Sequence, residues 1–161
     1  MRLYVWNGSL WDPVLGSTVD TNNLTVSAPV SHLSVYCAAT ASDQDADGLI
    51  DLNEYVLGNN PFNPDTDGDG MSDGQEVLAG TDPNSAASIF KITSVHQNSN
   101  GSIRLQWSSV SNKLYEVKRS LSAWRASSVT LMSNVAATPP VNSFIDAAPT
   151  NAAAFYWIEV H

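Results

Sequence analysis

Apolar and polar residues alternate along much of the C-terminal part of the chain, residues 89–161. Ile103, Leu105 and Trp107 take every second position of one short run, with Arg104 and Gln106 between them. A period of two is typical of a β-strand that buries one face and exposes the other. Six such runs, which predict an antiparallel β-sandwich, follow one another: IFKITSV, SIRLQWSSV, LYEVKRS, VTLMSNV, NSFIDA and AFYWIEV. The residues expected in the facing layer of its core are Tyr115, Val117, Phe155, Trp157 and Val160.

Residues 1–41 show shorter runs of the same kind. RLYVW, LTVSA and HLSVYCA are strand-like, and Asn7-Gly8 predicts a tight hairpin turn after the first of them. Three or four strands are too few to bury a core of their own. This β-rich segment is therefore expected either to pack on the C-terminal sandwich or to be the end of a larger domain in a longer natural chain.

Residues 42–88 have a different composition, with few β-branched residues and frequent Gly and Pro. Of the 16 acidic residues of the chain, 11 lie between residues 43 and 86, and no Lys or Arg occurs between Arg2 and Lys91. Carboxylates gathered so closely repel one another by about 1 kcal/mol or more per pair at contact distance. A folded structure of this segment therefore requires a positive charge that the sequence does not supply.

The acidic segment is an internal repeat with a period of 22 residues, since 43–64 aligns with 65–86. Both copies have Asp at positions 1, 3, 5 and 9, Gly at 6, Glu at 12, Gly at 16 and Pro at 19. Each copy matches D-x-[DN]-x-[DN]-G-x5-E, the pattern of an EF-hand calcium loop. The repeat therefore predicts two loops of the same construction.

The spacing assigns a role to each position of these loops. The side chains at 1, 3 and 5 converge as the chain curls, and the glycine at 6 allows the turn. The carbonyl at 7 turns inward, position 9 reaches the ion directly or through water, and the glutamate at 12 contributes both oxygens. The candidate ligands are Asp43, Asp45, Asp47, the Leu49 carbonyl, Asp51 and Glu54, then Asp65, Asp67, Asp69, the Met71 carbonyl, Asp73 and Glu76. Hard oxygen ligands in this number favour Ca²⁺, about one ion per loop, over Mg²⁺ or Zn²⁺.

The alternative is an acidic linker that binds no metal and stays extended by self-repulsion. Apolar residues at fixed places, such as Leu49, Ile50 and Met71, argue against it because a solvated linker has no use for them. A calcium sensor that opens a groove between long helices is also not expected. The helix after the first loop has only NEYVLG before Asn59 and Pro61 end it.

The acidic segment resembles the bacterial thrombospondin type 3 repeat. PDTDGDG, DGQE and GTDPN carry the resemblance in the second copy, whereas the first copy has Asn59-Asn60-Pro61 in place of Thr-Asp-Pro. The resemblance covers about 42–86 and implies a compact, calcium-stapled and mostly non-enzymatic segment of an exported or cell-surface bacterial protein. More weakly, residues 89–161 resemble a fibronectin type III-like sandwich, in which six strands would leave one position unfilled.

Together these features predict a mainly β protein with three parts: a β-rich segment at 1–41, tandem calcium repeats at 42–88 and an Ig-like or fibronectin III-like sandwich at 89–161. The expected function is that of a calcium-binding linker, in which calcium stiffens the connection between β domains. One alternative is the non-catalytic tail of a secreted hydrolase or of a glycan-binding protein, for which Trp6, Trp11 and Trp124 are candidate sugar platforms. Another is a dockerin-like module that docks a partner.

No enzyme activity is expected, because His32, His96 and His161 are scattered and no nucleophile, base and orienting group recur together. The expected partners are calcium ions and an extracellular or cell-surface protein or glycan, as in adhesion. Nucleic acid is not expected with this charge, and no apolar run reaches the length of a membrane span. The start MRLYVWNGSL lacks the pattern of a signal peptide, so the expectation is a fragment of a longer exported protein.

Overall fold

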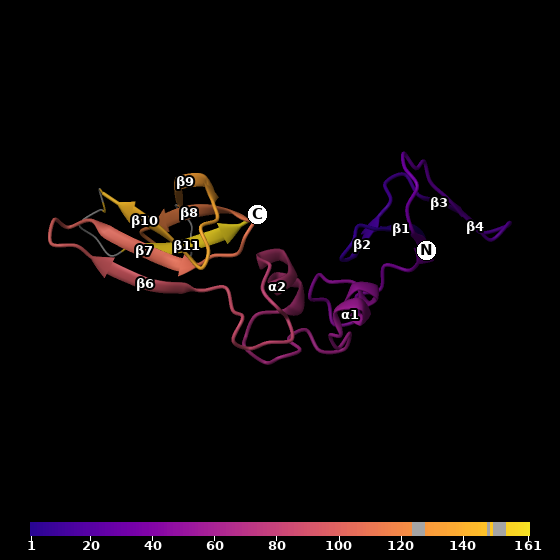
Figure 1. Ribbon diagram of the computed structural model, residues 1–161, viewed down its shortest axis with the longest axis horizontal. Coiled ribbons are helices and arrows are strands. Elements are labelled where there is room, and N and C mark those ends of the chain that lie inside the picture. Colours follow the sequence, from indigo (N-terminus) through magenta and orange to yellow (C-terminus); the bar gives the residue numbers. More distant parts are fainter. Residues whose placement is uncertain (124–127, 148, 150–153) are drawn as a thin grey trace. The chain divides into compact units, whose positions relative to one another are not determined.

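The computed structural model describes residues 1–123, 128–147, 149 and 154–161 and forms two units (Figure 1). The first unit comprises residues 1–66 with 72–74, and the second comprises 67–71 with 75–161. Strands far outnumber helices, which confirms the prediction of a mainly β protein with short helical turns. The three-part division predicted from composition stays a prediction.

The first unit contains a small antiparallel sheet with strand order β2-β1-β5. Its strands are β1 (Arg2–Trp6), β2 (Trp11–Pro13) and β5 (Tyr36–Ala39), and a separate ribbon pairs β3 (Thr18–Asp20) with β4 (Thr25–Ser27). The predicted hairpin is present between β1 and β2, where the Asn7 N–H donates to the Leu10 carbonyl at 3.1 Å. Tyr4 of β1, the middle strand of this sheet, is buried.

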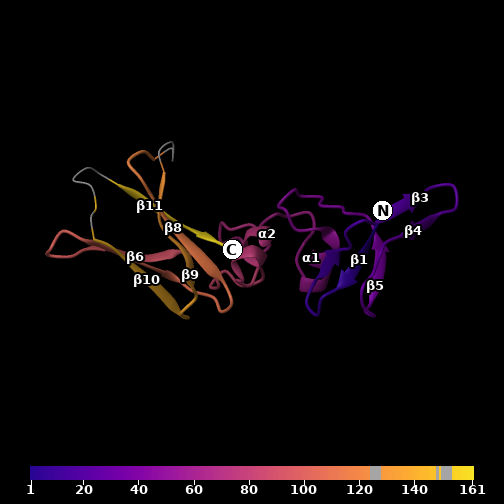
Figure 2. The same ribbon diagram turned by 90° about the horizontal axis from the view of Figure 1, so that it is seen from above.

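The second unit contains two three-stranded antiparallel sheets (Figures 1 and 2). One has the order β10-β7-β6, and the other has the order β11-β8-β9. Their bounds are β6 (Ile92–Gln97), β7 (Ile103–Ser108), β8 (Leu114–Ser120), β9 (Val129–Ala136), β10 (Val141–Asp146) and β11 (Phe155–Val160). Each of the six runs predicted as strands contains one, although β6 begins only at Ile92, three residues into the first run. The Ig-like or fibronectin III-like fold stays a prediction, and the word sandwich denotes only these two sheets, β10-β7-β6 and β11-β8-β9.

The core of the sandwich lies between β7 and β8, one strand from each sheet. Leu105, Trp107, Tyr115 and Val117 are fully buried, and the Trp107 and Tyr115 rings meet edge to face with centroids 5.7 Å apart. Such aromatic pairs add about 0.5–1.5 kcal/mol beyond the apolar area they bury. The predicted inward face of β7 is confirmed.

The facing layer was predicted correctly on β8 but wrongly for two residues of β11. Tyr156, Ile158 and Val160 pack on the core, whereas Phe155 is 45% exposed and the Trp157 indole donates to Glu159 at 3.1 Å. The cause is the register with β8, in which Val160 lies opposite Tyr115 and Ile158 opposite Val117. Alternation along the strand then turns the odd-numbered residues outward.

Each repeat contributes one helix of seven residues, α1 (Asp51–Leu57) and α2 (Asp73–Ala79). Both end at a glycine with positive φ, 84° at Gly58 and 79° at Gly80. These glycines donate their N–H to the carbonyls of Glu54 and Glu76, a helix ending in which glycine avoids the penalty that a Cβ would bring. Among the described residues, no helix has both the length and the apolar character needed to cross a bilayer.

Candidate metal centre

The first loop brings three predicted ligands together. Asp43, Asp45 and Asp47 each offer one carboxylate oxygen, and these oxygens lie within 4.8 Å of one another. Hydrogen bonds inside the loop hold this curl: the Leu49 N–H donates to Asp47 Oδ1 at 2.7 Å, and the Gly48 N–H donates to Asp43 Oδ2 at 3.2 Å. Backbone donors therefore orient the carboxylates toward a common point.

The second loop repeats this arrangement one period later in the chain. Asp65, Asp67 and Asp69 each place one carboxylate oxygen within 4.8 Å of the others. The Met71 N–H donates to Asp69 Oδ1 at 2.8 Å, as the equivalent Leu49 N–H does to Asp47. The Asp69 N–H donates to Asp67 Oδ1 at 3.1 Å. The Asp47 N–H donates in the same way to Asp45 Oδ1 at 3.4 Å. These two shared contacts indicate that the sequence repeat is also a repeat of local geometry.

The glutamates at position 12 lie in the middle of each short helix and, with Asp73, are the most deeply buried acids of the repeats. Glu54 and Glu76 are both 0% exposed. Neither carboxylate oxygen of Glu54 has a hydrogen-bond partner among the described residues, and the same is true of one buried oxygen each in Asp43 and Asp45. A buried carboxylate without a partner is strongly unfavourable. These carboxylates therefore fit a bound cation, which would interact with the oxygens that have no hydrogen-bond partner.

The pKa values of the first loop reflect this unbalanced charge. Burial, followed by the negative charges of Asp45, Asp47, Asp51 and Asp73, raises the pKa of Glu54 to about 7. Burial and the charge of Asp47 also raise the pKa of Asp45. A divalent cation among these groups would favour their charged forms. Asp73 belongs to the second repeat, so the two copies contribute charge to the same place.

The aspartates at position 9 make a contact that the spacing alone did not predict. The two oxygens of Asp51 accept hydrogen bonds from the backbone and side-chain N–H groups of Gln44, both at 3.0 Å. In the second copy, Asp73 accepts from the Thr66 N–H at 2.9 Å and from the Thr66 hydroxyl at 2.7 Å. The aspartate at position 9, the first residue of each helix, thus accepts hydrogen bonds from position 2, where both copies carry a polar donor.

The ionisation of Asp51 agrees with this structural role. Burial opposes its charge, but hydrogen bonds from Gln44 and Ser42 outweigh burial and lower its pKa. Direct or water-mediated metal binding by Asp51 and Asp73 stays a prediction, as does the ligand role of the Leu49 and Met71 carbonyls. These two carbonyls belong to the residues whose N–H groups orient the aspartates at position 5.

The first repeat is also anchored to the sheet of its own unit. The side-chain amide oxygen of Asn53 accepts the Trp11 N–H at 2.8 Å, and its Nδ2 donates to the Trp11 carbonyl at 3.4 Å. Asn53 is buried, and the Trp11 and Trp6 rings lie 5.4 Å apart between centroids. Trp124, the third candidate sugar platform, lies outside the described residues.

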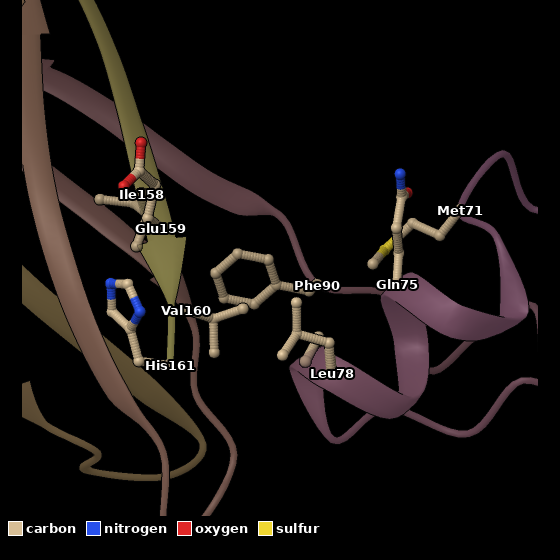
Figure 3. Close-up of a pocket in the computed structure, with 9 residues that line it drawn as sticks. Met71, Gln75, Leu78, Phe90, Ile158, Glu159, Val160 and His161 are labelled. Atoms are coloured by element: carbon tan, nitrogen blue, oxygen red, sulfur yellow. The ribbon is translucent and has the colours of Figure 1, made fainter. Parts of the chain in front are cut away.

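The second repeat contacts the sandwich of the second unit through α2. Lys113 Nζ donates to the Leu78 carbonyl at 2.5 Å, so a cation lies at the negative end of the helix. Met71, Leu78, Phe90 and Val160 line an open, mainly apolar groove of about 370 Å³ there (Figure 3). The repeat and the sandwich are therefore joined within this unit by side chains as well as by the chain itself.

A further acidic group, on the sandwich, has its own counter-charge. Glu116, Glu159 and His161 each offer an atom within 4.8 Å of the others. Lys118 Nζ lies 3.1 Å from Glu116 Oε2 and 2.5 Å from Glu159 Oε2. The first loop differs in this respect: among the described residues, none of the ion pairs involves Asp43, Asp45, Asp47 or Glu54.

Together, the paired loops and buried glutamates define a calcium-binding class of repeat module. The family model of the bacterial TSP3 repeat matches residues 65–86. Residues 65–86 are therefore a bacterial TSP3 repeat, which confirms the predicted resemblance for the second copy, whereas the resemblance of the first copy stays a prediction. Neither the curated proteins nor the solved structures include a match to the chain.

Proposed function

We propose that this chain is a calcium-binding structural module of an exported or cell-surface bacterial protein and has no catalytic activity of its own. In this proposal calcium stiffens the segment that connects the β-rich parts of the chain. The observation that carries it is Glu54, whose carboxylate is fully buried and has no hydrogen-bond partner for either oxygen among the described residues. The TSP3 match over the second copy supports the same class of module.

The residues themselves account for the dependence on metal. Asp43, Asp45, Asp47 and Glu54 would hold the ion of the first loop, and Asp65, Asp67, Asp69 and Glu76 would hold that of the second. Bound calcium supplies positive charge that offsets the mutual repulsion of these carboxylates. Because the unfolded chain has no preformed site, the free energy of binding becomes free energy of folding. Extracellular modules of this kind work with dissociation constants of about 10⁻⁴–10⁻³ M.

Calorimetric titration of the calcium-depleted chain tests this function. We expect two ions per chain in the wild type and one in the Glu54→Gln variant, because an amide keeps the size of the carboxylate but not its charge. Calcium should also raise the melting temperature. Absence of both binding heat and a change in melting would overturn the proposal. The hydrolase-tail, glycan-binding and partner-docking alternatives stay predictions.

A further inference from the structure

A hydrogen bond connects the second repeat to a predicted ligand of the first. The Gly74 N–H, in the first turn of α2, donates to Asp47 Oδ2 at 2.6 Å across 27 residues of sequence. The other oxygen of Asp47 accepts the Leu49 N–H at 2.7 Å. Both oxygens of this one carboxylate are therefore oriented by backbone donors, one from each copy of the repeat.

The contact requires a residue without a side chain. A Cβ built on Gly74 would lie 2.6 Å from the Asp47 carbonyl oxygen and 3.1 Å from the Leu49 nitrogen. These neighbours are backbone atoms, which cannot rotate away as a flexible side chain can. The φ angle of Gly74 is not positive, so backbone conformation alone does not require glycine here. Close approach to the first loop does.

The first copy shows that a loop of this kind accepts a side chain at the same position. Its residue 10 is Leu52, which is half-buried in α1. The glycine at position 10 of the second copy therefore serves its neighbour rather than its own loop. This difference between the copies makes the role of Gly74 separable by experiment from the construction of the second site.

We propose that Gly74 is a positioning residue for the calcium site of the first loop: its N–H orients Asp47, and its lack of a Cβ lets α2 reach that loop. The proposal rests on the calcium binding proposed above. Groups that orient a metal ligand from outside the coordination shell change metal affinity by about 10–100-fold when altered. The first site thus reaches full affinity only when the second repeat is folded beside it. Because coupling between binding equilibria is reciprocal, calcium in the first loop should in turn order the start of α2.

The Gly74→Ala variant tests this in the full chain, with calcium affinity measured by calorimetry. Helix propensity alone predicts that alanine stabilises α2. We instead expect the first site to weaken by about tenfold or more. In the Glu76→Gln background, where the first site remains, Gly74→Ala should weaken that site. In the Glu54→Gln background, where the second site remains, it should change affinity less than about twofold.

Gln75→Ala is the matched control, because Gln75 is the exposed neighbour of Gly74 in the same helical turn. It should leave both sites within about twofold of the wild type. A general structural effect of Gly74→Ala would instead weaken both sites and lower the melting temperature in chelator. Equal losses at the two sites, or no loss at either, would overturn the positioning role while two ions in the wild type still supported calcium binding.

Amide hydrogen exchange of Gly74 in the wild type decides the question even where Gly74→Ala does not fold. We expect calcium to slow exchange of this amide, because filling the first site fixes its acceptor, Asp47. In the Glu54→Gln variant, which retains the second site, the slowing of Gly74 amide exchange by calcium should be smaller by a factor of about ten or more, as reciprocal coupling requires. Equal protection in both proteins would contradict the inference. Failure of the wild type to bind calcium would instead overturn the proposed function itself.

Discussion

The interiors of the repeats and of the sandwich are built from opposite kinds of side chain. In the sandwich, Leu105, Trp107 and Val117 are fully buried and stabilise the fold by removing apolar surface from water. In the repeats, Glu54 and Glu76 are among the largest fully buried side chains. The first kind of interior requires no ligand, whereas the second depends on dissolved calcium if the proposed function holds.

The apolar residues of the repeats are too few to stabilise the folded loops in place of the proposed calcium ions. Leu49 and Ala79 are buried, but Tyr55, Phe62 and Leu78 are each more than half exposed. Fully burying a large apolar side chain contributes about 1.5–3 kcal/mol, so one leucine and one alanine provide little against the conformational entropy of the ordered loops. The comparison thus predicts that the two regions respond differently to the same change in conditions.

Removal of calcium should produce the largest difference. In the wild type with excess chelator, we expect amides of the helix ends to exchange fast, because the loop carboxylates repel and the helices lose their support. The reporters are the amides of Gly58 and Asn59, which donate to the Glu54 carbonyl, and those of Gly80 and Thr81, which donate to the Glu76 carbonyl. Hydrogen exchange followed by mass spectrometry measures this by segment.

Amides of β7 and β8 serve as the internal control in the same sample. Their protection should persist in chelator, since their core contains only apolar and aromatic residues. Equal loss of protection in the strands and in the repeats would show that the sandwich also depends on calcium. Unchanged protection in the repeats would show that their carboxylates need no metal.

Substitution within the sandwich core should have the reverse effect. Trp107→Ala is expected to lower the free energy of unfolding of the sandwich by about 3–5 kcal/mol, because it removes a fully buried indole. Calcium stoichiometry should stay at two ions. Chemical denaturation followed by Tyr and Trp fluorescence measures the first quantity, and calorimetric titration the second.

Trp157→Ala provides the matched tryptophan control on the outer face of β11. Its side chain is only half-buried and lies away from the core cluster, so we expect a loss of about 1 kcal/mol or less. Similar losses at Trp107 and Trp157 would contradict the assignment of the odd-numbered residues of β11 to the outer face.

The stability of the repeats, unlike that of the sandwich, should also depend on pH, because Glu54 titrates. Its pKa is raised from 4.5 to about 7 on folding, so the folded chain without metal binds this proton more tightly than the unfolded chain. The stability that this provides is complete below about pH 4.5 and is lost as the pH rises through about 7. In chelator, the melting temperature of the repeats should therefore fall over this range.

Excess calcium should reverse that slope, because protons and calcium compete for the same carboxylate. Calorimetric melting at several pH values, with and without chelator, measures both slopes. Glu54→Gln is the control: it cannot titrate at this position, and its slope in chelator should be smaller. If the melting temperature of the wild type in chelator instead rises with pH, Glu54 is not the dominant titrating group.

Features that depend on local spacing could be predicted from the sequence. The six strands of the second unit follow from alternation within each run, and both loops follow from the positions of aspartate and glycine within twelve residues. The helix ends at Gly58 and Gly80 are local as well. In each of these, the residues that interact are neighbours along the chain.

Features that depend on distant segments could not be predicted. FYWIEV has apolar residues at both parities, so only pairing with β8 determines that Tyr156 and Ile158 face inward. The Asn53 contact with Trp11 spans 42 residues, and no pattern in either segment indicates it. The Gln44 and Thr66 contacts had a signal, a polar donor at position 2 of both copies, which the calcium-loop pattern leaves unspecified.

The smallest expected effect concerns position 4 of the two loops, where both copies have positive φ but only one has glycine. Ala46 has a φ of 62°, whereas the equivalent Gly68 has a φ of 78°. The left-handed conformation costs a residue with a Cβ about 1–2 kcal/mol. Glycine at Ala46 would relieve this strain but would lose about 0.5–1 kcal/mol through the greater freedom of the unfolded chain. We therefore expect Ala46→Gly to stabilise the calcium-bound repeats by up to about 1 kcal/mol, measured by denaturation in saturating calcium. Gly68→Ala should destabilise them by a similar amount, and the same sign for both substitutions would refute the strain assigned to Ala46.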